Sequence, residues 1–274
     1  MSAHRLVNHS RRFWPLWLVA GLLSAAFVVL ACLSRLAPGL QTWDQHVTGV
    51  FIGWRSARWS RALWIFTLIG DDPVMALLSA AVVVPLAVWG KRGRAAAGAL
   101  GLIIAWLVMT LTKALVGRER PPQSEALIHR PVSHSMPSGH ALVSAVFVGL
   151  LAYLVFMWMA DRRRRGKSSL AWAVALKSGA VLAAAATTGF VGISRVYLGV
   201  HWMSDVIAGW CLGGSLLCAT LWLATGWQRD GGPRGLLRDT APLVGRRRRV
   251  CIAAGLAVLV CAVTVVTALV DPLQ

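Results

Sequence analysis

Three short patterns place charged and ionisable side chains at the ends of long apolar segments. They are Lys113-(six residues)-Arg120-Pro121, Pro137-Ser138-Gly139-His140 and Ser194-Arg195-(five residues)-His201-(three residues)-Asp205. Together they supply three cations, two histidines and one carboxylate. Clustered cations neutralise phosphate oxygens, and two histidines can act separately as nucleophile and as general acid or base. The patterns therefore point to phosphoryl-group hydrolysis at a membrane surface.

The third pattern carries the most specific chemistry. His201 and Asp205 are four residues apart, so on a helix they would share one face, just after Arg195 closes the preceding apolar segment. A carboxylate at that depth in a span is costly, of order 2.5–3.5 kcal/mol, so it requires a partner. An aspartate that holds one ring nitrogen of histidine fixes the tautomer and leaves the other nitrogen free to attack. The alternative is a His–Asp pair that only stabilises the helix.

The other two patterns supply groups that bind anions. Arg120-Pro121 is expected to end a helix, because proline disfavours helical geometry in the residue before it, and Lys113 would share its face two turns earlier. Residues 137–139 are expected to start another helix, whose N–H groups and dipole favour phosphate, with His140 in the first turn. Taken alone, Lys113 could simply extend to the headgroups, and residues 137–139 could simply cap the helix.

Composition predicts an integral membrane protein. Of the 274 residues, 57% are hydrophobic and 14% are charged, and a soluble domain cannot bury so much apolar surface. The net charge of +18 raises the possibility of nucleic-acid binding. However, the basic residues form short clusters between apolar runs, as membrane loops do, so no nucleic-acid partner is expected.

Seven apolar segments are long enough, or nearly so, to cross a hydrocarbon core about 30 Å thick. They comprise residues 14–33, 73–89, 95–116, 138–160, 178–197, 202–225 and 250–270. The expected fold is an all-α, polytopic transmembrane helix bundle with a six-helix core and a seventh, C-terminal span. Residues 1–72 would form the first span and a long outer loop, 73–227 the core that carries the patterns, and 228–274 a basic loop and the extra span. In the outer loop, residues 47–69 mix tryptophans with arginines, which is typical of a helix in the membrane interface or of one packed on the bundle.

Basic residues predict the orientation of the bundle. Most of them fall in the N-terminal tail, in the loop after residue 89, in the run 162–167 and in the segment 229–249. With seven spans these regions share one side, which the positive-inside rule assigns to the cytoplasm. The N-terminus would then be cytoplasmic and the three patterns extracytoplasmic. A bacterial inner membrane suits such a chain.

The three patterns resemble the three-part signature of the type 2 phosphatidic acid phosphatase family. All eleven specified positions match in the same order, and the resemblance covers roughly residues 65–225. That family groups membrane lipid phosphate phosphatases with soluble bacterial acid phosphatases and vanadium-dependent haloperoxidases. Its membrane members usually have six spans, so the seventh span expected here is a departure.

The resemblance implies a role for each matched residue. His201 would attack phosphorus and form a phosphohistidine, while Asp205 would orient the ring and stabilise its charge. His140 would protonate the leaving group and then act as a base toward water. The phosphoryl oxygens would be bound by Lys113, Arg120, Ser138, Gly139 and Arg195. No cofactor or metal is implied, and the sequence offers no carboxylate cluster to hold one.

The leading hypothesis is an enzyme that hydrolyses a lipid phosphate or diphosphate at the outer leaflet, with the lipid and the bilayer as its partners. Phosphatidic acid, phosphatidylglycerol phosphate, undecaprenyl diphosphate and lipid A phosphate all fit. Transfer of the phosphoryl group to another lipid is an alternative. A transporter is disfavoured because the ionisable residues cluster near one face. A haloperoxidase ranks last, because it would need vanadate and its relatives are soluble. No oligomeric state follows from the sequence.

Overall fold

The computed structural model describes residues 3–229, and it describes side chains from residue 14 to residue 225. Within that range the chain forms helices and no strand, so the all-α class is confirmed. The α-helices are α1 (Ala3–Leu36), α2 (Pro38–Gly53), α3 (Ala57–Thr67), α4 (Asp72–Val88), α5 (Arg92–Val116), α6 (Gly139–Arg164), α7 (Leu170–Tyr197) and α8 (Met203–Arg229). Two short 3-10 helices, η1 (Leu68–Gly70) and η2 (Gln123–Glu125), lie in the connections.

Within residues 3–229, five helices are long and apolar enough to cross a membrane, namely α1, α5, α6, α7 and α8. A sixth crossing is formed if α3 with η1 is joined to α4, since this pair passes the same test but bends by 55°. The predicted span at 73–89 corresponds to α4, which has 17 residues and does not pass the test by itself. The predicted span at 250–270 lies outside the described residues.

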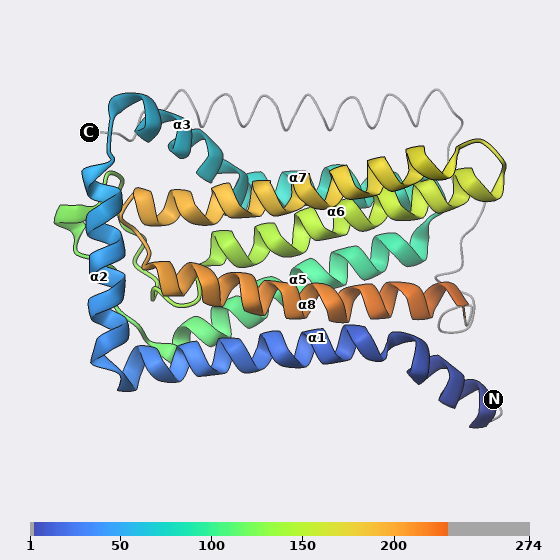
Figure 1. The fold of residues 1–274 in the computed structure, drawn as a ribbon, viewed down its shortest axis with the longest axis horizontal. Coiled ribbons are helices and arrows are strands. Elements are labelled where there is room, and N and C mark those ends of the chain that lie inside the picture. Colours follow the sequence, from blue (N-terminus) through green and yellow to red (C-terminus); the bar gives the residue numbers. More distant parts are fainter. Residues whose placement is uncertain (1–2, 230–274) are drawn as a thin grey trace.

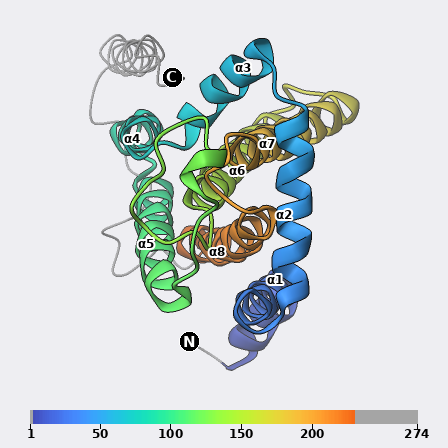
Figure 2. The same ribbon diagram turned by 90° about the vertical axis from the view of Figure 1, so that its left-hand side faces the viewer.

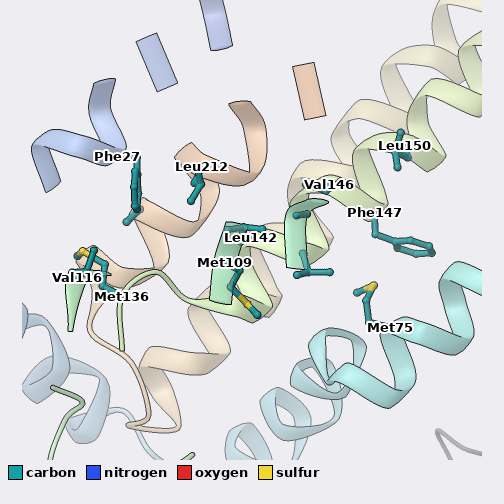
Figure 3. Packing of buried hydrophobic residues seen from close by; sticks show 13 residues of the cluster. Phe27, Met75, Met109, Val116, Met136, Leu142, Val146, Phe147, Leu150 and Leu212 are labelled. Carbon is teal, nitrogen blue, oxygen red and sulfur yellow. The ribbon is translucent and has the colours of Figure 1, made fainter. Parts of the chain in front are cut away.

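The long helices lie side by side, and α2 runs across one end of them (Figures 1 and 2). We call this the α2 end. In the bundle, α8 contacts α1, α5 and α6, while α7 packs on α6 and α3. Met109 of α5, Leu142 and Val146 of α6 and Leu212 of α8 belong to one apolar cluster (Figure 3). This cluster packs the first turns of α6 against α5 and α8.

The connection between the first two crossings differs from the prediction. The single helix expected over 47–69 is broken into α2 and α3. Ser56 caps α3 by accepting a hydrogen bond from the backbone N–H of Trp59. Arg55 fixes the corner, because its guanidinium donates to the carbonyl oxygen of Tyr197 at 2.9 and 3.1 Å. The break lets α2 cover the end of the bundle while α3 follows α7 (Figure 1).

Glycines in α8 allow it to approach α6 closely. A Cβ on Gly209 would lie 2.7 Å from the carbonyl oxygen of Ser138, and one on Gly213 would lie 2.6 Å from that of Leu142. Small residues let helix backbones pack tightly inside a membrane. The approach also allows the Ser138 N–H to donate to the carbonyl oxygen of Asp205 at 3.0 Å, which joins the start of α6 to the start of α8.

Gly209→Ala is therefore expected to destabilise the protein by about 1–3 kcal/mol, because a backbone carbonyl cannot rotate away from the added methyl group. The thermal unfolding midpoint in detergent should fall. Gly179→Ala in α7 is the matched control, since its Cβ meets nothing within 4 Å. Equal midpoints for the two variants would contradict the close packing of α6 and α8.

Candidate active site

A cavity of about 400 Å³ lies at the α2 end of the bundle. It is lined by residues of α3, α4, α5, α6 and α7 and of the connections between them. The predicted site residues that line it are Lys113, Arg120, Gly139, His140, Arg195 and His201. Ser138 and Asp205 are fully buried beside it. A larger apolar groove, of about 630 Å³ between α6, α7 and α8, contains none of the predicted site residues.

The ring of His201 lies between an acidic and a basic partner. Its Nδ1 is 3.5 Å from Oδ2 of Asp205 and 3.3 Å from Oγ of Ser135, and its Nε2 is 3.0 Å from Nη1 of Arg120. A guanidinium only donates hydrogen bonds, so Nε2 is the unprotonated nitrogen and Nδ1 carries the proton. The geometry thus presents a lone pair on Nε2 toward the cationic groups of the cavity.

The His–Asp pair is not arranged along one helical face, as the spacing predicted. His201 lies two residues before α8 begins at Met203, and the two side chains meet because the turn before the helix folds back. The backbone N–H of Trp202 donates to Oδ2 of Asp205 at 2.9 Å. This bond closes the turn and holds the carboxylate beside the ring.

Asp205 has the partners that its burial requires. Oδ1 accepts a hydrogen bond from Nη1 of Arg118 at 2.7 Å, and Oδ2 accepts one from Oγ of Ser135 in addition to that from Trp202. Because both oxygens are bound, the carboxylate cannot rotate away from His201. The sequence predicted that Asp205 needs a partner. The structure supplies Arg118 and Ser135, which the sequence patterns did not identify.

Lys113 and Arg120 reach the cavity from different elements. The helix expected to end at Arg120-Pro121 ends at Val116, where Gly117 adopts a left-handed backbone with φ of 63°. The two cations therefore do not share one helical face. Lys113 Nζ donates to the carbonyl oxygen of His134 at 2.6 Å, and Arg120 Nη1 donates to that of Val200 at 2.7 Å. These carbonyl groups are neutral, so neither contact removes the positive charge.

His140 also has an acidic partner, which was not predicted. Its Nε2 is 2.8 Å from Oδ1 of Asp71, in the turn between η1 and α4. A Cβ on the preceding residue, Gly70, would lie 2.6 Å from Cδ2 of His140, so the close approach depends on glycine. A carboxylate bound to one ring nitrogen orients the imidazole and leaves the other nitrogen available.

Two buried polar groups of the site, Oγ of Ser138 and Nε of Arg195, have no hydrogen-bond partner among the residues that the structure describes. Arg195 donates through Nη1 to Oγ1 of Thr67 at 2.8 Å, and this contact also leaves its charge intact. Buried donors without partners are costly, and a bound phosphoryl group would satisfy them. The backbone N–H of Ser138, in contrast, already donates to the backbone carbonyl oxygen of Asp205 and is not available to an anion.

The positive charge of the cavity acts on its histidine. The pKa of His201 is held well below the ordinary value of 6.5, first by burial and then by the charges of Arg120, Lys113 and Arg195. Burial also lowers the pKa of Arg120 to about 10, so its guanidinium stays charged at neutral pH.

Within the described part of the chain, no three His, Cys, Asp or Glu side chains gather to hold a metal ion. The donors present suit an anion.

Sequence reasoning missed Asp71, Ser135, Arg118 and Thr67. Arg118 and Ser135 had a local signal, since each lies inside or next to a recognised pattern. Asp71 and Thr67 had none, because their partners follow more than sixty residues later in the chain. Only the folded arrangement of α3, η1 and α4 brings them to the cavity.

Comparisons with known proteins identify a family for about half of the chain. Residues 94–229 match the PAP2 superfamily. An undecaprenyl-diphosphatase from Sulfolobus acidocaldarius is 32% identical over 118 residues, which cover 42% of this chain and 47% of that protein. Phosphatidylglycerophosphatase B from Bacillus subtilis is 33% identical over 107 residues, covering 39% and 46%. This chain thus matches about half the length of each of these relatives.

A crystal structure shares the fold. It is described as the first transmembrane PAP2 type phosphatidylglycerolphosphate phosphatase from Bacillus subtilis, and it superposes with a TM-score of 0.65 at 23% identity over 77% of this chain and 98% of that chain. The chain therefore carries a PAP2 superfamily domain, and the family predicted from the three patterns is confirmed. It is a multi-pass membrane protein.

The depressed pKa of His201 predicts the acid limb of the pH profile. If His201 is the nucleophile that the three patterns predict, its ring must be unprotonated to attack. A lowered pKa preserves that form at lower pH, so kcat/KM for phosphate release should begin to fall only below pH 6.5. The profile should be measured with two substrates whose phosphate groups titrate differently, because a limb common to both belongs to the enzyme. A common limb at or above pH 6.5 would contradict the assignment.

Proposed function

We propose that this protein is a lipid phosphate phosphatase that hydrolyses a phosphomonoester or diphosphate through a phosphohistidine at His201. The observation that carries the proposal is the unprotonated Nε2 of His201, 3.0 Å from Arg120, in a cavity whose cations are not neutralised. The names of the two relatives, an undecaprenyl-diphosphatase and a phosphatidylglycerophosphatase, support the choice of a lipid phosphate.

In the first step the cations bind the phosphoryl oxygens. Arg120 turns from Nε2 of His201 to the phosphoryl group, and Lys113 and Arg195 bind the remaining oxygens. Nε2 then attacks phosphorus, and the P–N bond forms as the bond to the leaving oxygen breaks. The ring becomes a cation, which Asp205 stabilises from the Nδ1 side. Charge stabilisation and positioning supply most of the rate in phosphoryl transfer.

His140 transfers the protons of both steps. The nitrogen not held by Asp71 donates a proton to the leaving oxygen and afterwards takes one from water. That water attacks the phosphohistidine, which releases inorganic phosphate and restores His201. Ser138 Oγ and the N–H of Gly139, at the start of α6, bind the phosphoryl group through both steps.

The cavity also fits a lipid that is still in the bilayer. Trp64, Pro73 and Met109 give it an apolar wall on the side of α3, α4 and α5. A tail can lie against that wall while the phosphate reaches the histidines. Phosphatidylglycerol phosphate and undecaprenyl diphosphate are the substrates we favour, with phosphatidic acid and lipid A phosphate as further candidates.

We place the active site on the extracytoplasmic side of a bacterial inner membrane. The basic loops between α4 and α5 and between α6 and α7 lie at the end of the bundle opposite the cavity (Figure 1). The positive-inside rule assigns that end to the cytoplasm. A site at the other end receives lipid phosphates of the outer leaflet.

Phosphate release by the purified protein in detergent tests the proposal, with a panel of the four lipids and EDTA present. His201→Ala should lower kcat by at least about 10⁴-fold, because it removes the nucleophile. His46→Ala is the control, since this exposed histidine of α2 lies outside the cavity, and it should leave the rate unchanged. Release that survives His201→Ala, or that requires a divalent metal, would overturn the proposal.

Asp71→Asn tests the role of His140. Without the carboxylate the ring is poorly oriented, so kcat on an alkyl phosphate is expected to fall by roughly 10²-fold, the usual size of a general-acid contribution. A nitrophenyl phosphate needs little protonation of its leaving group and should lose much less. Asp161→Asn is the control, since this half-buried carboxylate near the other end of α6 does not line the cavity. An equal loss on both substrates would contradict leaving-group protonation by His140.

A further inference from the structure

A second carboxylate lies behind the His201–Asp205 pair, on the helix that crosses the end of the bundle. Arg118 donates through Nη1 to Oδ1 of Asp205 and through Nη2 to Oδ2 of Asp44, each at 2.7 Å. Asp44 belongs to α2 and is fully buried, and Arg118 is 7% exposed. One guanidinium therefore joins a carboxylate beside the proposed nucleophile to a carboxylate of an element outside residues 94–229.

Ser204 closes this arrangement into a network. Its Oγ accepts a hydrogen bond from Nη1 of Arg118 at 2.6 Å and donates to Oδ2 of Asp44 at 2.6 Å. Its backbone N–H donates to Oδ1 of Asp44 at 2.9 Å. Since Ser204 precedes Asp205 directly, the network fixes both the backbone and the side chain at the start of α8. Gln41 adds a further acceptor for Nη2 at 3.0 Å.

We infer that Arg118 and Asp44 are positioning residues for the His201–Asp205 pair, so that α2 is part of the apparatus that orients the nucleophile. This inference rests on the phosphohistidine function proposed above. Arg118 holds one oxygen of Asp205 and thereby directs the other toward Nδ1 of His201. Arg118 falls at an unspecified position of the first pattern, and Asp44 lies outside all three patterns.

The sharing of one guanidinium between two carboxylates has an electrostatic consequence. A guanidinium bound to Asp205 alone would compete with the cationic ring of His201 for the negative charge of the carboxylate. Asp44 binds Nη2 of Arg118 and shares its positive charge. Asp205 therefore retains more negative charge to stabilise the ring of His201 when that ring carries the phosphoryl group. Removal of Arg118, in contrast, leaves two buried carboxylates without their shared cation, which is strongly unfavourable.

A purely structural role for Arg118 would be to tie α2 to the bundle. Arg35 offers a matched comparison, because it donates through Nε to the carbonyl oxygen of Val116 at 2.9 Å and through Nη2 to that of Leu115. It thus ties α1 to the end of α5 and has no contact with Asp205. Loss of Arg35 should affect stability without affecting the chemical step.

The test measures kcat, KM and the thermal midpoint of the full-length protein in detergent with one lipid phosphate. Arg118→Met is expected to lower kcat by roughly 10²-fold, the loss that a misplacement of about 1 Å at a reacting group can cause, with little change in KM. Arg118→Lys should recover only part of this loss, because an ammonium cannot bridge two carboxylates as a fork. Asp44→Asn should lower kcat less than Arg118→Met. The kcat of the Arg118→Met/Asp44→Asn double variant should be higher than the product of the two single effects predicts. The reason is that the net charge of these buried groups returns to that of the wild type.

Arg35→Met and His201→Ala are assayed beside these variants. A normal kcat in Arg118→Met and Asp44→Asn, with His201→Ala inactive, would overturn the positioning role and leave the proposed function intact. A loss confined to the thermal midpoint, equal to that of Arg35→Met, would overturn it too. If His201→Ala remains active, both the function and this inference fail. If Arg118→Met does not fold, Asp44→Asn and Ser204→Ala decide by the same kcat criterion.

Discussion

A carboxylate buried at the start of α8 is the constraint on which the rest of the site depends. Asp205 cannot remain there without donors, and the donors come from Arg118, Ser135 and the turn at Trp202. Through these bonds the segment after α5, the segment before α6 and the α7–α8 turn all contact the carboxylate of Asp205. The histidine in that turn is oriented as a by-product of satisfying the carboxylate, and α2 joins the same network through Asp44.

Function follows from which charges are paired and which are not. The acidic groups Asp205 and Asp71 contact the two histidines, whereas Lys113 and Arg195 contact only neutral carbonyl or hydroxyl oxygens. The cavity therefore keeps positive charge where an anion can enter, and this charge, together with burial, disfavours protonation of His201. Because these cations would bind a soluble anion too, the proposed function assigns selection for a lipid to the apolar wall formed by α3, α4 and α5.

Apolar length predicted the long helices, and residue type predicted the polar groups that the structure gathers at the α2 end. Local geometry was less predictable. Proline at 121 indicated the end of α5, but Gly117 ends it a turn earlier, because a left-handed C-cap favours glycine. The broken outer segment depends on Arg55 and Tyr197, which meet only after folding. Asp71 and Asp44 could not be identified, because their contacts with His140 and Arg118 span distant parts of the chain.

The most direct test of the account is detection of the phosphorylated enzyme. The protein is mixed with its fastest lipid substrate, quenched in base to preserve phosphohistidine, digested and analysed by mass spectrometry. The account predicts phosphate on His201. With a nitrophenyl phosphate, whose leaving group needs little protonation, the level should be higher in His140→Ala, because that variant lacks the base that activates water. Phosphate on another residue, or turnover with no phosphoenzyme and inversion of configuration at phosphorus, would contradict it.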